Sequence, residues 1–136
     1  MRIVFSAVKK NDDLDTLIEL GATSFLFSFE DKKVVKQVEH LARYTNTKFL
    51  IIIDSGAFSA WNRGAKIDIN HYADFMSKVK KIQMVHELHF INLDIIPQVK
   101  GTKPTKEQIK LACEKGVENY RYLKSKGHST MHVFHQ

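Results

Sequence analysis

Short apolar runs alternate with amphipathic stretches along the whole chain of 136 residues, and this alternation constrains the fold more than any other feature. The apolar runs have the length of strands, whereas the stretches between them repeat apolar residues at helical spacing. Because strands that alternate with helices form βα units around a parallel sheet, the sequence predicts a single α/β domain over residues 1–136. The runs expected to form strands are residues 2–8, 23–29, 48–53, 87–94 and 129–135.

Local signals place the ends of the helices between these strands. The first helix is expected from about Asp12 to Leu20, with Gly21 as its C-terminal stop. A second follows Asp31, which can cap it, and a third begins near Asp68 and Asn70. The last helix extends to Gly127 from a capping box that Thr105 and Gln108 can form.

The third apolar run, KFLIII, is almost wholly apolar, so we expect a central strand that is covered on both faces. Residues 55–68 follow it and are rich in glycine and aromatic residues, which predicts a long loop. Two architectures fit the order of elements. One is a partial TIM (β/α)8 barrel made of about the first five strands and truncated at its C-terminus, and the other is a complete five-stranded doubly wound sheet.

Composition narrows the class of partner. Lysine and arginine number 21 against 15 acidic residues, which gives a formal net charge of +6 and a pI near 9.4. This excess favours polyanions such as nucleic acid, although a solvated helix surface explains it equally well. Cys113 is the single cysteine, so we expect a reducing cytoplasmic location and no closed multi-cysteine zinc site. No apolar run approaches the roughly 20 residues of a bilayer helix, so no membrane is expected.

Three polar residues follow three of the predicted strands and form the strongest constellation in the sequence. Asp94 follows Asp54 by 40 residues, and Gln136 follows Asp94 by 42. Each interval is about one βα unit, so all three side chains should meet at the carboxyl edge of the sheet, where α/β proteins bind ligands. For each residue taken alone, the alternative is a structural role in capping a helix or closing a turn.

The chemistry of this set suits a purine base. A carboxylate accepts hydrogen bonds only, whereas an amide both donates and accepts, and together they match the Watson–Crick edge of guanine better than a phosphate. Ser55 and Gly56 are small enough to let a ligand approach the backbone, and Phe58 or Trp61 offers a face for stacking a base.

The run IDSGAFSAW, which begins at residue 53, resembles the Asp-Ser-Gly-Gly-Phe/Tyr-Gln segment of the tRNA-guanine (queuine) transglycosylases. It is similar to phage and bacterial relatives thought to insert 7-deazaguanines into tRNA or DNA. The resemblance implies a base-exchanging pentosyltransferase with a TIM barrel. It implies that Asp54 is the acid and base beside the purine, that Phe58 stacks on it, and that Asp94 and Gln136 read its edge.

The chain departs from the family pattern at several points. Ala57 replaces the second glycine and Ser59 replaces the glutamine. The family's nucleophilic aspartate follows a later strand, and its structural zinc uses a cysteine cluster, so neither is expected here. The resemblance therefore implies that this chain supplies the purine-binding half, without a cofactor, and that a second copy or a second chain completes the barrel. The alternatives are a non-catalytic module that binds a nucleotide or nucleic acid, and an inactive fragment.

Paired histidines do not change this expectation. His86 with His89, and His132 with His135, lie three residues apart at or within predicted strands. Because residues three apart on a strand point to opposite faces, neither pair is expected to chelate a metal.

Overall fold

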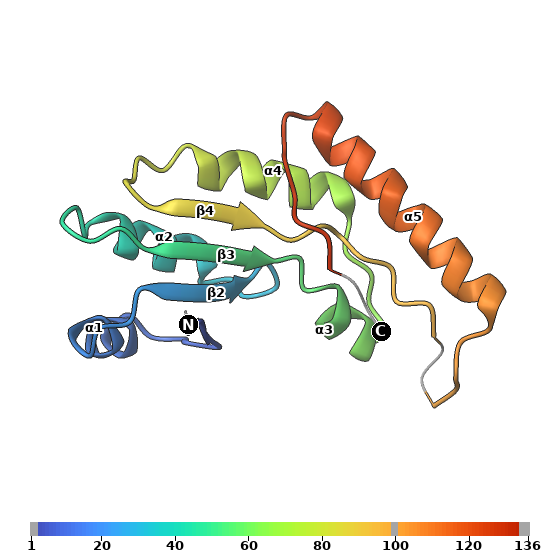
Figure 1. Ribbon diagram of the computed structural model, residues 1–136, viewed down its shortest axis with the longest axis horizontal. Helices are drawn as coiled ribbons and strands as arrows, with labels where there is room; N and C mark the ends of the chain where they lie inside the picture. Colours follow the sequence, from blue (N-terminus) through green and yellow to red (C-terminus); the bar gives the residue numbers. More distant parts are fainter. Residues whose placement is uncertain (1–2, 99–100, 134–136) are drawn as a thin grey trace.

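The computed structural model describes residues 3–98 and 101–133. Strands and helices alternate through these residues, and the α/β class is confirmed (Figure 1). The strands are β1 (Phe5–Ser6), β2 (Ser24–Ser28), β3 (Leu50–Asp54) and β4 (Glu87–Phe90). The helices are α1 (Asn11–Glu19), α2 (Val34–Ala42), α3 (Ala57–Asn62), α4 (Ile69–Lys80) and α5 (Lys106–Ser125). None of the described helices is both long and apolar enough to cross a membrane.

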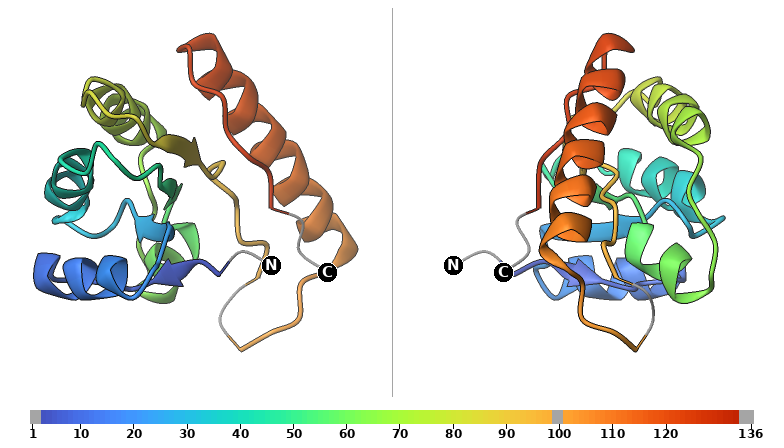
Figure 2. Two further views of the ribbon diagram at one scale, coloured as in Figure 1. Left: turned by 60° about the vertical axis from the view of Figure 1, so that its left-hand side comes forward. Right: turned by 90° about the vertical axis from the view of Figure 1, so that its right-hand side faces the viewer.

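The four strands form one parallel sheet in the order β1-β2-β3-β4, which is the order of the sequence. A doubly wound sheet contains a reversal of strand order, and the described strands contain none. Crossovers between neighbouring parallel strands are right-handed, so successive helices fall on the same side of the sheet. Figure 2 (left) shows α1, α2 and α4 on one side of the strands.

The core lies between the sheet and this helix layer. Phe25, Phe27, Ile51 and Ile53 alternate along β2 and β3 and are buried there, where they pack against apolar side chains of the helices. The expected central place of β3 is confirmed, because it pairs with β2 and β4. The expectation that both its faces are covered is wrong. Ile52 is only half-buried, because α1, α2 and α4 lie on one side of the strands and leave the other face less covered.

Residues 55–68 are not wholly a loop, which corrects the sequence prediction. Six of them form α3, and Gly56 at φ +75° starts the helix in a left-handed conformation. A helix of this length is too short to show an apolar period, so its glycine-rich flanks dominate the sequence pattern. Asp68 then caps α4, because its side chain accepts hydrogen bonds from the backbone N–H groups of Asn70 and His71.

Other predicted ends agree with the structure to different extents. Thr105 and Gln108 form the expected capping box of α5, and Gly21 at φ +90° ends α1. Asp31 does not cap α2 directly. Its carboxylate accepts from the N–H of Lys33, which is itself the N-cap residue, so the helix begins later than expected.

The first and last predicted strands are shorter than expected. β1 stops at Ser6 because Ala7 adopts a positive φ of 60°, which turns the chain out of the sheet. At the other edge, the described part of residues 129–135 makes one parallel bridge, between Ile91 and Met131, instead of a full strand. This bridge lies just beyond the end of β4, so the segment still runs beside it.

Candidate functional site at the carboxyl ends of the strands

Asp54 is the last residue of β3, where the sequence predicts it. Its Oδ2 accepts a hydrogen bond from the backbone N–H of Gly56 at 2.9 Å, and its carbonyl accepts from the N–H of Phe29 at 2.8 Å. One carboxylate oxygen therefore closes the turn after the strand, as the structural alternative predicts. The other oxygen, Oδ1, receives no hydrogen bond from the residues that the structure describes.

Gly56 is held closely against the neighbouring connection. A Cβ at this position would lie 2.4 Å from Cγ of Glu30, which follows β2. Glu30 forms an ion pair with Arg63 just after α3, so it is tied to the same segment from the other side. The backbone at Gly56 therefore lies directly against the side chain of Glu30, which leaves no room for a side chain at position 56.

The other residues of the motif differ in exposure. Ser55 is buried, with 2% of its surface exposed, whereas Phe58 is 60% exposed. The ring of Phe58 lies 5.6 Å from that of Trp61, centroid to centroid, and the two planes are tilted by 34°. The indole N–H of Trp61 donates to the carbonyl of Gln98 at 2.8 Å, which joins α3 to the segment after β4. Phe58 therefore presents an open aromatic face on a helix that is held at its far end.

Asp94 lies four residues beyond the end of β4, not at the strand end as the sequence predicts. The ladder stops at Phe90, because the backbone of Asn92 pairs instead with Met131. Asp94 is half-buried and lies in the wall of a cavity of about 430 Å³. Asp54 is not part of this wall.

Tyr72 is a buried phenol in the neighbourhood of both carboxylates. It is fully buried on α4, and its hydroxyl donates to the carbonyl of Ile91 at 2.7 Å. Burial raises the pKa of its phenol, and the negative charges of Asp54 and Asp94 raise this pKa further. Both carboxylates therefore lie within electrostatic reach of one phenol, at the same edge of the sheet. Sequence reasoning missed this position, because the ring of Tyr72 fits the apolar repeat of the helix that begins near Asp68.

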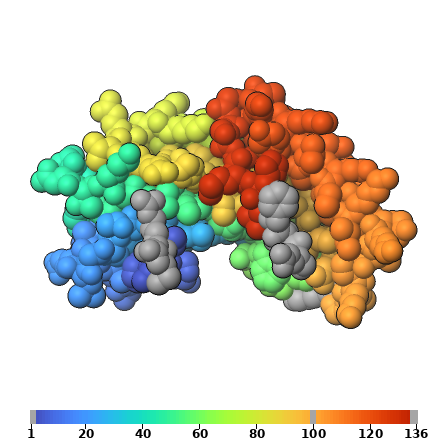
Figure 3. Space-filling view, in the orientation of Figure 1, coloured from blue at the N-terminus to red at the C-terminus, as the bar shows by residue number. Residues whose placement is uncertain are grey.

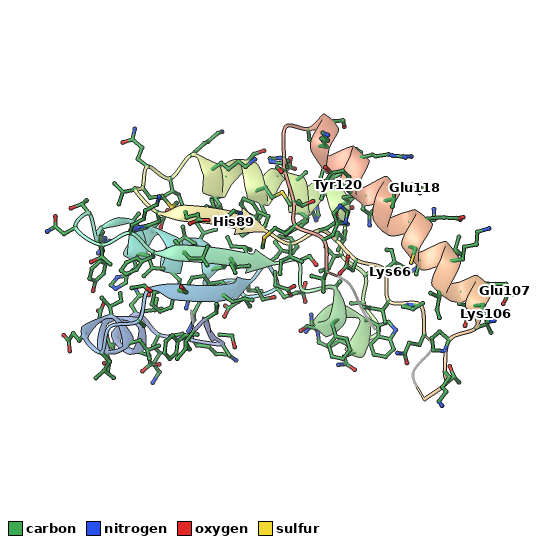
Figure 4. The ribbon with its side chains drawn as sticks, viewed as in Figure 1. Lys66, His89, Lys106, Glu107, Glu118 and Tyr120 are labelled. Atoms are coloured by element: carbon green, nitrogen blue, oxygen red, sulfur yellow. The ribbon has the colours of Figure 1, made fainter. Side chains whose placement is uncertain are left out.

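The cavity lies between α3, the segment after β4 and the first half of α5. Ala57 and Trp61 line it from the motif helix, while Lys66 and Lys115 bring positive charge to the wall that holds Asp94. Figure 4 shows Lys66 between α3 and α5. The space-filling view shows a separate notch in the lower outline of the molecule, between the N-terminal elements and α3 (Figure 3).

Two asparagines that sequence reasoning missed hold the segment that carries Asp94. Asn92 is fully buried, and its amide donates to the carbonyl of Gly116 at 3.0 Å. Asn119 donates to the carbonyl of Leu93 at 2.8 Å. A signal for Asn92 exists in the sequence, because it is a polar residue inside an apolar run. Asn119 has no local signal, since its partner is 26 residues away.

His86 and His89 have structural partners, whereas His135 of the second predicted pair lies outside the described residues. His86 directly precedes β4. Its Nε2 donates to the carbonyl of Leu41 at 2.6 Å, and its Nδ1 accepts from the N–H of Phe49 at 3.3 Å. His89 pairs with Glu87 at 2.7 Å. Within residues 3–98 and 101–133, no three histidine, cysteine or acidic side chains are grouped so as to hold a metal ion.

Gln136, the third member of the predicted set, lies outside the described residues. Comparison of the chain with protein-family models, with curated proteins and with solved structures gives no significant match.

Proposed function

We propose that this chain supplies the purine-binding half of a base-exchanging pentosyltransferase similar to the tRNA-guanine transglycosylases. Its substrate would be guanine in tRNA or DNA, replaced by a 7-deazaguanine, and its site of action the cytoplasm. The observation that carries the proposal is the placement of Asp54 at the carboxyl end of β3 and of Asp94 just after the carboxyl end of the neighbouring β4. Two acceptors at one edge suit a base that presents several N–H donors.

The topology of the sheet supports the barrel part of the proposal. In a (β/α)8 barrel the strands pair in the order of the sequence and all helices lie outside, with the site at the carboxyl ends. The order β1-β2-β3-β4 and the helices on one side are the arrangement expected of such a half-barrel. Its open face and edge would be covered by a second copy or a second chain.

In this proposal Asp54 moves the proton of the exchange. A carboxylate nucleophile from the completing half bonds to the ribosyl C1′ while the bond to N9 of guanine breaks, and Asp54, in its protonated form, gives its proton to the leaving base and becomes a carboxylate. The incoming 7-deazaguanine returns a proton to Asp54 as its nitrogen bonds to C1′, so protons balance over the cycle. Oδ1 is the oxygen available for this transfer, because Oδ2 holds Gly56.

The remaining residues would bind the base. Phe58 offers a stacking face, Ser55 and Gly56 allow close approach, and Asp94 and Gln136 read the purine edge. For the full chain titrated calorimetrically with guanine, 7-deazaguanine and adenine, we expect binding of the first two but not of adenine. Asp94→Asn should weaken guanine binding about tenfold, because the amide group can place a donor opposite an N–H donor of guanine where the carboxylate placed an acceptor.

Asp74→Asn is the matched control, because Asp74 is an exposed carboxylate on α4 outside the site and its loss removes the same charge. Asp54→Asn should abolish exchange of labelled guanine in the reconstituted enzyme while the protein stays folded, since an amide oxygen can still accept from Gly56. Unchanged incorporation in Asp54→Asn would refute the catalytic role.

The second candidate is a module that binds a nucleotide or nucleic acid without chemistry. The observation in its favour is the hydrogen bond from Gly56 to Asp54, which gives this carboxylate a turn-closing role that needs no catalysis. The same titration separates the two candidates. Equal affinity for guanine and adenine, with no effect of Asp94→Asn, would favour the module.

A further inference from the structure

A second hollow, of about 270 Å³, lies where α1 and α2 begin. Lys9, Lys10, Lys33 and Lys36 line it, together with Asn11 and Gln37. All four lysines are exposed, and none of them forms an ion pair with a residue that the structure describes. Four ammonium groups around one hollow repel each other, so an anion that enters the hollow lowers the free energy of the protein.

The fold brings these lysines together from two connections. Lys9 and Lys10 follow β1 and precede α1, whereas Lys33 and Lys36 lie at the start of α2. Because β1 and β2 are parallel neighbours, both connections leave the sheet at the same edge. The positive φ of Ala7 turns the first connection, which then lies against α2.

Gln37 is the residue that locks the two connections. Its side-chain amide donates to the carbonyl of Val8 at 2.6 Å, immediately before Lys9. Gln37 is only 2% exposed, and its Oε1 is buried without a hydrogen-bond partner among the described residues. A buried acceptor in the wall of a lysine-lined hollow is unusual, because buried polar atoms are nearly always paired. One residue of the wall therefore holds a buried acceptor without a partner, beside the excess positive charge of the lysines.

The helix ends add to the same field. The N-cap residues of α1 and α2 are Lys10 and Lys33, and neither helix has a side-chain cap. The first turn of α2 contains no acidic residue, whereas α1 carries Asp12 and Asp13 there. The positive end of a helix favours anions, and the first turn of α2 contributes such attraction, although the carboxylate of Asp31 already accepts from the N–H of its N-cap residue Lys33.

We propose that this hollow binds phosphate groups. The proposal rests in part on the proposed function. There the phosphates belong to the backbone of the nucleic acid whose purine enters at the same edge of the sheet. An anion that draws the lysine side chains inward also brings their N–H donors inward. Each ammonium has three donors, more than one phosphate oxygen uses, and one of them can pair with Oε1 of Gln37.

The test uses the full chain and an oligouridylate of about 12 nucleotides, measured by fluorescence anisotropy. This probe contains phosphates but no purine, so its binding does not depend on the purine site. Lys33→Gln combined with Lys36→Gln should weaken binding about tenfold in low salt. It should also lower the slope of log affinity against log salt by about 0.7 for each lysine removed.

The matched control is Lys106→Gln combined with Lys110→Gln. Both pairs remove two charges near the beginning of a helix. Figure 4 shows Lys106 at the beginning of α5, on the opposite side of the molecule from α1. We expect less than a twofold change for the control pair. An equal loss in both pairs would overturn the proposal, because it would show that overall charge, not the hollow, holds the backbone.

A second measurement, with inorganic phosphate, distinguishes free phosphate from the phosphates of a nucleic acid as the ligand. At constant ionic strength it should raise the Tm of the unaltered chain relative to chloride, and Lys33→Gln with Lys36→Gln should remove this increase. If phosphate stabilises the chain but oligouridylate does not bind, the site is supported with free phosphate as its ligand. If neither probe responds to the Lys33 and Lys36 changes, the proposal is refuted, whatever the guanine titration gives.

Discussion

At the scale of single residues, Gly56 is the most constrained position near the candidate site. It adopts φ +75°, and a Cβ there would lie 2.4 Å from Glu30. Gly64, at the other end of α3, has a similar φ of +71° but nothing within 4 Å of the same point. The two glycines share the conformational constraint, and only Gly56 has the steric one, so together they separate the two effects.

We predict that Gly56→Ala lowers the free energy of unfolding by about 3 kcal/mol or more, whereas Gly64→Ala lowers it by about 1 kcal/mol. Alanine at either position occupies a left-handed conformation that it disfavours. At position 56 it also displaces Glu30 and with it the ion pair to Arg63. Urea unfolding followed by the fluorescence of Trp61, the single tryptophan, measures both changes.

A double-variant cycle tests the cause. Glu30→Ala removes the Cγ atom that Cβ would meet, so Gly56→Ala should cost less in that background than in the unaltered chain. Equal losses at positions 56 and 64, or no relief in the Glu30→Ala background, would contradict the close approach.

At the scale of elements, His128 anchors the turn after α5 to α4. It is buried, and its Nδ1 accepts from the ammonium of Lys80 at 3.0 Å. Because a lysine ammonium can only donate, the ring proton is on Nε2, which lies 3.2 Å from the hydroxyl of Ser77. Burial lowers the pKa of His128, and the positive charge of Lys80 lowers it further. The contact therefore requires a neutral ring.

We predict that the chain loses stability as the pH falls from 7.5 to 5.5, in part through His128. A histidine whose pKa is lower in the folded state contributes its stability above its unfolded pKa of about 6.5 and loses it as the pH falls below that value. His128→Gln keeps a donor for Ser77 but has no proton to gain, so its urea midpoint should fall less over the same range.

The comparison between the two proteins isolates His128, since the other histidines are common to both. Parallel curves of urea midpoint against pH would show that His128 does not contribute. Lys80→Met provides a second check, because removal of the neighbouring charge should raise the pKa of His128 in the folded state toward its unfolded value and so reduce the loss of stability at low pH.

At the scale of the whole molecule, the helices are anchored unequally. α2 buries Val34, Gln37, Val38 and Leu41 within nine residues, whereas α5 buries only Ala112 and Leu123 within twenty. α5 also exposes large apolar side chains, namely Ile109, Leu111 and Val117. Its connection to the rest of the chain relies largely on polar contacts such as those of Asn92 and Asn119.

We predict that the backbone amides of α5 exchange with deuterium faster than those of α2 and α4, because local opening costs less where little apolar surface is buried. Hydrogen exchange with mass spectrometry of the full chain measures this directly. If α5 were as protected as α2, its apolar residues would be covered in solution. Sedimentation at two protein concentrations would then show whether a second copy covers them.

The candidate site could be predicted only in outline. The DSGAF run marks Asp54, Ser55 and Gly56 as candidates, and the turn that they form depends only on residues close in sequence, while their binding roles stay predictions. The distance of Asp94 from the strand end depends on where β4 stops. The lysine-lined hollow was not visible, because its members come from two separate connections.

The sequence by itself determined the alternation of strands and helices, the central place of β3, and caps such as Asp68 and the Thr105–Gln108 pair. These features rest on apolar runs or on hydrogen bonds between residues at most a few positions apart. The tertiary structure alone decided the strand order, the open face of the sheet and the contacts of Asn119 and Gln37. Their partners lie 26 and 29 residues away, so the local pattern around each residue carries no record of them.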